Sequence, residues 1–182
     1  GMDGRLAFYS GDDSKFEYIY KFITRDAWDG SLGAHHGRLL DDGILYVARF
    51  EEDGSARWLP LLFGENGLTT ENGFVDQADV LVHARAAADI VGATKMDRPE
   101  WITVHPHNDE VFVSLTNNSD RGQQDNVGKD AANPRNQNLF GHIIKFSEAD
   151  ATATEFSWQV FVLAGEGEGE QFANPDCLYI DD

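Results

Sequence analysis

The sequence is poor in cysteine, in basic residues and in long apolar runs. Cys177 is the only cysteine, which excludes an internal disulfide and a cysteine-rich zinc cluster. Because Leu178 and Tyr179 follow it, we expect its side chain to be buried as a small apolar group. Only 14 Lys and Arg residues stand against 32 Asp and Glu, and the formal net charge of −18 argues against nucleic acid or an anionic membrane as a partner. No apolar run is long enough to span a membrane, and no signal peptide is visible.

The excess of carboxylates has two explanations that charge alone does not separate. One is solubility; the other is that some carboxylates bind hard cations such as calcium, which prefer oxygen ligands. The histidines give little support for a zinc site. Two pairs, His35 with His36 and His105 with His107, lack the flanking ligands of zinc sites and are interpreted as solvated loop residues. The chain also lacks a Gly-x-Ser-x-Gly elbow and a Gly-Lys-Ser/Thr phosphate loop, so serine hydrolases and nucleotide-binding proteins have no support.

Alternating apolar and polar residues predict a chain made mostly of β-strands. The aromatic residues of 16–24 fall on one face of a strand, and Glu17 falls on the other face near its start. The stretches 28–40, 64–73 and 117–137 are rich in polar residues and glycine and predict loops. The predicted strands are 6–10, 16–24, 44–50, 56–63, 101–105, 110–116, 142–146, 156–164 and 177–180.

One helix is predicted over about 77–91. Asp76 is its expected N-cap, and Gly92 its expected C-terminal stop. The residues at helical spacing that predict a single apolar face are Ala78, Leu81, Ala84, Ala88 and Val91.

A weak internal repeat organises the strands. "RLAFYSGDD" resembles "EVFVSLTNN", "YIYKFITRD" resembles "HIIKFSEAD", and "RPEWITV" resembles "NPDCLYI". Repeated four-stranded antiparallel units predict β-propeller blades, here about two in a single partial propeller domain over 1–182. The first blade part would be 1–75, the helix 76–92, the second blade 93–165 and the start of the next 166–182. An all-β sandwich with one helix is the alternative.

The segment Arg98-Pro99-Glu100 places a cation and an anion on either side of one proline. Proline fixes its own φ and disfavours the α region for the residue before it, so we expect Arg98 and Glu100 to project from a stiff extended backbone. A fixed guanidinium beside a fixed carboxylate suits a site that holds a phosphate next to a metal ion. A structural ion pair is the other reading, and the residues alone leave both open.

Several long blocks resemble the C-terminal half of the PhoX family of calcium-dependent alkaline phosphatases. They include "GRLAFYSGDDSKFEYIYKFIT", "HARAAADIVGATKMDRPEWITV", "VFVSLTNNS", "GHIIKF" and "NPDCLYI", and they follow the family's order over nearly the whole chain. The resemblance implies a secreted or periplasmic phosphomonoesterase on a six-bladed propeller with calcium and iron at its centre. The chain would then be a fragment or short form of such an enzyme.

The resemblance also implies residue roles. Glu17 and Glu100 would be metal ligands, and Arg98 would hold the substrate phosphate. Cys177 lies in a different block from the family's iron-binding cysteine and takes no such role. Open sheet edges would be covered by self-association or by a missing N-terminal half. The alternative function is a non-catalytic, propeller-derived module that binds calcium or serves as a scaffold.

Weaker candidates follow the predicted strands. Asp12 and Asp13 belong to a Gly-Asp-Asp sequence that is typical of a turn. The alternative is that the two carboxylates bind calcium. Asn117 and Asn118 end a strand and would contact phosphate if that end points inward. The stretch 133–135, Asn-Pro-Arg, indicates a loop more strongly than it indicates a binding motif. The aspartates at 41, 42 and 53 lack the spacing of an EF-hand.

Overall fold

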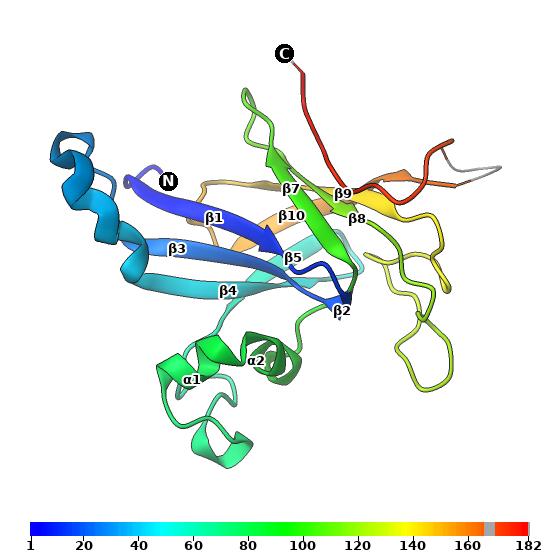
Figure 1. The fold of residues 1–182 in the computed structure, drawn as a ribbon, viewed down its shortest axis with the longest axis horizontal. Helices are drawn as coiled ribbons and strands as arrows, with labels where there is room; N and C mark the ends of the chain where they lie inside the picture. Colours follow the sequence, from blue (N-terminus) through cyan, green and yellow to red (C-terminus); the bar gives the residue numbers. More distant parts are fainter. Residues whose placement is uncertain (166–169, 182) are drawn as a thin grey trace.

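The computed structural model describes residues 1–165 and 170–181 and has one large antiparallel sheet (Figure 1). The sheet order is β1-β3-β4-β5-β10-β9-β8-β7. The sheet consists of two four-stranded meanders. The sequence predicted all eight of its strands, and the predicted all-β fold is confirmed. The first meander is β1 (Arg5–Gly11), β3 (Ile19–Ala27), β4 (Gly43–Phe50) and β5 (Ser55–Pro60). The second is β7 (Pro99–Val104), β8 (Val111–Leu115), β9 (His142–Glu148) and β10 (Glu155–Leu163).

The sheet is nearly closed. Its two meanders are joined by a short ladder in which Glu155–Ser157 of β10 pairs with residues 55–57 of β5. At the opposite edges, β1 and β7 meet where Gly11 ends β1 and Pro99 begins β7. A Cβ atom on Gly11 would lie 2.2 Å from the Pro99 carbonyl oxygen, so only glycine allows this approach.

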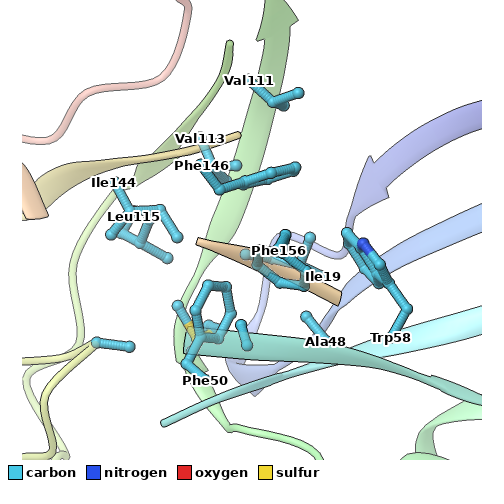
Figure 2. Close-up of a cluster of buried hydrophobic side chains, with 13 residues drawn as sticks. Ile19, Ala48, Phe50, Trp58, Val111, Val113, Leu115, Ile144, Phe146 and Phe156 are labelled. Carbon is cyan, nitrogen blue, oxygen red and sulfur yellow. The ribbon is translucent and has the colours of Figure 1, made fainter. Parts of the chain in front are cut away.

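The main core lies between the inner faces of the two meanders, and Figure 2 shows its side chains pointing toward one another. Aromatic rings fill its centre. The ring centroids of Phe50 and Phe156 are 5.6 Å apart in an edge-to-face contact, and those of Trp58 and Phe156 are 4.9 Å apart. The labelled members are Ile19, Ala48, Phe50, Trp58, Val111, Val113, Leu115, Ile144, Phe146 and Phe156.

The predicted helix forms as two short helices that cover the outer face of β3 and β4 (Figure 1). Helix α1 (Gln77–Val82) and helix α2 (Ala84–Val91) are separated at His83, whose φ of −108° and ψ of 39° are not helical. The break corrects the predicted face: Ala78 and Leu81 are exposed. The side chains that the two helices bury are Val80, Ala87 and Ala88, which pack on Tyr18, Tyr20 and Val47.

Both predicted helix ends are confirmed. The Asp76 side chain accepts a hydrogen bond from Asp79 N at 2.9 Å, and Gly92 adopts the left-handed conformation that ends α2. We expect Asp76→Ala to lower the free energy of unfolding by about 1 kcal/mol, because the orphan amides of the first turn lose their acceptor. Urea unfolding of this variant measures the effect. Asp76→Asn, which also caps, should stay near the wild type, and equal losses in both variants would contradict the capping role.

A second, two-stranded sheet lies beside the main one. It pairs β2 (Lys15–Glu17) with β6 (Met96–Asp97), so that Glu17 lies opposite Met96. The strand predicted over 16–24 is therefore interrupted at Tyr18, and Phe16 has a φ of 66°. The strict alternation expected of one continuous strand does not hold across this break.

Three further predictions are corrected. The loop predicted at 28–40 contains a 3₁₀ segment, η1 (Gly30–Asp41); a second short one, η2 (Thr70–Asn72), precedes the helices. Residues 177–180 form no strand, and Cys177 is exposed rather than buried. The start of the next blade, predicted over 166–182, lies partly outside the described residues. None of the described helices has the length and apolar character needed to cross a membrane.

Candidate active site

A β-bulge at the start of β7 directs Glu100. Pro99 pairs with Leu115 and Ile102 pairs with Val113, so Glu100 and Trp101 together oppose the single residue Ser114. Ile102 packs against the core, whereas Trp101 is 47% exposed. The extra residue lets Glu100 share the outer face with Thr116, whose hydroxyl donates to the Glu100 Oε2 atom at 3.0 Å.

Arg98 precedes this bulge and has a φ of 59°. This left-handed conformation is uncommon for a residue with a side chain and corrects the expected extended backbone. The Arg98 side chain binds Asp13 through two atoms: Nε lies 2.8 Å from Oδ1, and Nη2 lies 2.9 Å from Oδ2. Asp13, a weak candidate in the sequence, therefore holds the predicted phosphate-binding guanidinium from the turn after β1.

A further carboxylate, that of Asp176, meets Glu100 at Thr116. The one hydroxyl proton of Thr116 has three acceptors within reach: Glu100 Oε2 at 3.0 Å, the Pro175 carbonyl at 3.1 Å and Asp176 Oδ1 at 3.5 Å. Burial, together with the neighbouring Asp176 and Asp13 carboxylates, raises the pKa of Glu100 above its ordinary value. Glu100 and Asp176 therefore share one hydroxyl donor, that of Thr116.

Glu17 is buried, with its side chain 4% exposed, and lies under helix α2. Its Oε1 atom is 2.5 Å from Nη1 of Arg85, while its Oε2 atom has no hydrogen-bond partner among the described residues. Burial raises the pKa of Glu17, against the opposing effect of Arg85, and the charge of Asp12 raises it further. The turn at Asp12-Asp13 thus acts on both predicted metal ligands, Asp12 on Glu17 and Asp13 on Glu100.

Two other buried carboxylates show what full pairing looks like. Asp97 receives Arg121 Nε on one oxygen at 2.6 Å and Asn138 Nδ2 on the other at 3.0 Å. Glu148 receives Lys21 and Trp58 on Oε1 and Tyr9 on Oε2. Buried carboxylates in proteins are normally satisfied in this way. The orphan Oε2 of Glu17 is the exception among the buried carboxylates of the described residues.

The position of β6, between Glu17 and Arg98, depends on Arg121. This side chain is fully buried and binds Asp97, the Gly128 carbonyl at 2.9 Å and the Lys95 carbonyl at 2.6 Å. Since β6 pairs with β2 and leads directly into Arg98, Arg121 supports both halves of the site. This role was not predictable from the sequence, because Arg121 lies in a polar stretch that predicts a solvated loop.

The remaining weak candidates contact other residues of the chain. Asn117 donates to Asn174 at 3.0 Å; Asn118 is buried, and its backbone amide donates to the Asn138 carbonyl. Asn133 is buried and donates to the Lys95 carbonyl at 3.0 Å. His105 and His107 follow β7, at the opposite end from Glu100, with ring centres 5.9 Å apart.

The described residues do not form a complete metal site by themselves. In ranges 1–165 and 170–181, no three His, Cys, Asp or Glu side chains are grouped so as to hold one ion. The orphan oxygen of Glu17 and the crowded Glu100–Asp176 pair nevertheless fit hard cations, which take carboxylate oxygens. An ion bound at either carboxylate needs further oxygen ligands, such as water.

Comparison with known proteins gives two matches. A family model described as alkaline phosphatase PhoX matches residues 1–182. A solved structure, Pseudomonas fluorescens PhoX in complex with vanadate, a transition state analogue, is 40% identical with a TM-score of 0.92, covering 98% of this chain and 35% of that one. This chain thus spans about a third of the length of the PhoX chain it matches. A search of curated proteins found no match.

Proposed function

Because the chain belongs to the PhoX alkaline phosphatase family, we propose that it is part of a metal-dependent phosphatase that hydrolyses phosphate monoesters. In this proposal it corresponds to the C-terminal half of the family's propeller, as a fragment or short form, and contributes about two of six blades. The enzyme is exported to the periplasm or secreted. The observation that carries the proposal is the convergence of the Arg98 guanidinium with the carboxylates of Asp13, Glu100 and Asp176 at one end of the sheet.

Arg98 binds the substrate phosphate. Asp13 occupies the Nε and Nη2 edge of the guanidinium and so fixes its plane, which leaves the Nη1 edge for two phosphate oxygens. The side chain is 27% exposed, so that a ligand can reach it from solvent. Arg98 thereby orients the phosphoryl group and offsets the charge on its oxygens.

Glu17 and Glu100 are the metal ligands that this chain contributes, and the metals are calcium and iron. When bound, such ions polarise the phosphoryl oxygens and activate an attacking oxygen. Glu17 would coordinate an ion through its orphan Oε2, and Glu100 would do so through the carboxylate that Thr116 holds. Asp176 lies close enough to Thr116 to add a second carboxylate beside Glu100.

Hydrolysis of p-nitrophenyl phosphate by the chain, supplied with calcium and iron, tests the function. The isolated chain is expected to have an incomplete site, so turnover requires that the missing N-terminal half or other copies of the chain complete it. Such turnover should be abolished by a chelator and restored by added metal. A folded chain that shows no turnover with both metals present would contradict catalysis by this segment.

Such a result would favour the alternative, a non-catalytic calcium-binding or scaffold module. The specific observation for it is that no three potential ligands group together among the described residues. The edge strands β1 and β7 would then serve self-association or contact with a missing N-terminal half.

Calcium is expected to stabilise the fold through Glu17 and Glu100. At a concentration 100 times the dissociation constant, a ligand that binds only the folded state adds about 2.7 kcal/mol. Thermal unfolding with and without calcium measures this gain. Glu17→Gln and Glu100→Gln should each reduce it, whereas Glu52→Gln, an exposed turn residue, should leave it unchanged. An equal calcium response in all four proteins would place the ion elsewhere.

A further inference from the structure

Arg85 is the second residue of helix α2 and contacts the inner carboxylate of the site. Its Nη1 atom lies 2.5 Å from Oε1 of Glu17, and its side chain is 54% exposed while that of Glu17 is 4% exposed. The guanidinium therefore covers a buried carboxylate from the solvent side. It binds one oxygen only, and the second oxygen, Oε2, remains buried without a partner among the described residues.

The location of Arg85 is set by the packing of its helix. Ala87 and Ala88 of α2 are fully buried in the cluster that contains Tyr18 and Tyr20 of the aromatic segment. The Tyr18 hydroxyl donates to Asp89 of α2 at 2.5 Å, which fastens the helix beside Glu17. Helix α2 thus brings a cation to Glu17 independently of whether an ion is bound.

We propose that Arg85 is a positioning residue that holds Oε1 of Glu17, so that Oε2 faces the metal ion. This inference rests on the proposed function, in which Glu17 is a ligand. A carboxylate with one oxygen fixed loses its freedom to rotate, and the other oxygen is then directed before the ion arrives. Partners of this kind, one step removed from the metal, typically change metal affinity 10- to 100-fold.

The sign of the effect separates positioning from simple electrostatics. Removing a positive charge near a cation site lessens repulsion, so charge alone predicts that Arg85→Ala binds calcium more tightly. Positioning predicts the opposite, a loss of affinity of about 10-fold or more. A matched control is Arg49→Ala, which removes the same charge from another part-exposed ion pair, Arg49 with Glu51 at 2.8 Å.

Calorimetric titration of the whole 182-residue chain with calcium chloride measures these affinities. We expect weaker binding in Arg85→Ala, partial recovery in Arg85→Lys, and no weakening in Arg49→Ala. Arg85→Gln serves as a second variant if the alanine protein does not fold, and thermal unfolding without calcium checks each fold. Unchanged or tighter binding by Arg85→Ala, with Glu17→Gln still deficient, would overturn the positioning role and leave Glu17 as a ligand. Wild-type binding that is absent, or that survives Glu17→Gln, would overturn both the positioning role and the ligand role of Glu17.

Discussion

Replacing Arg98 by alanine is expected to lower the rate of p-nitrophenyl phosphate hydrolysis by about 100-fold or more. Loss of one fixed donor to a charged transition state typically has an effect of this size, and Arg98 offers two N–H groups on the edge that Asp13 does not occupy. Steady-state assays with calcium and iron measure the change. Arg98→Lys keeps the charge but loses the planar fork, so its activity should lie between those of the wild type and the alanine variant.

The control for this prediction is Arg25→Ala. Arg25 also pairs with an aspartate, Asp42 at 2.7 Å, but it lies on β3 and both partners are well exposed. Its loss should leave activity unchanged. Orthovanadate inhibition gives a second measurement, because the alanine variant at 98 should require a much higher concentration. Activity within about threefold of the wild type would mean that the phosphate is held elsewhere.

Replacing Arg121 by methionine is expected to lower the free energy of unfolding by about 3–5 kcal/mol. Arg121 and Asp97 are both fully buried and 2.6 Å apart, so truncating Arg121 leaves the Asp97 carboxylate in the interior with the Asn138 amide but without its cationic partner. The Lys95 and Gly128 carbonyls also lose their donor. Urea unfolding followed by circular dichroism measures the loss.

Two variants complete this test. Arg38→Ala removes an arginine that is 91% exposed, and its effect should stay within about 0.5 kcal/mol. The double variant Arg121→Met with Asp97→Leu removes both buried charges and should be less destabilised than Arg121→Met alone. A single variant as stable as the wild type would show that the buried pair does not hold β6.

The sequence was sufficient for the eight strands of the main sheet and for the helix ends. Alternation located eight strands because one side of each lies against a core, and the aspartate at 76 and the glycine at 92 marked the helix limits by their local chemistry. The break at His83 was not predictable, because no proline or glycine interrupts the run of helix-forming residues. Exposure of Cys177 was missed for a related reason: the apolar residues after it imitate a strand.

The site was predictable only in part. The family resemblance implies roles for Glu17, Arg98 and Glu100, and the structure places Arg98 and Glu100 beside the Asp12-Asp13 turn. The bulge at Glu100 was hidden, because two outward-facing residues look like ordinary alternation until the partner strand is known. Asp13, Arg85 and Asp176 are joined to the site by tertiary contacts alone, which no local pattern records.

The pairing of β2 with β6 has a consequence for how the molecule is made. Lys15 pairs with Asp97, and most of the first meander and both helices lie between them in the sequence. Arg121, which binds Asp97, comes later still in the chain. Pairings between such distant residues form slowly, because closing the long loop between them costs conformational entropy before any contact offsets that cost. On a ribosome, the first meander can assemble while the later strands are still being synthesised. We therefore expect the candidate site to be among the last parts of this chain to form.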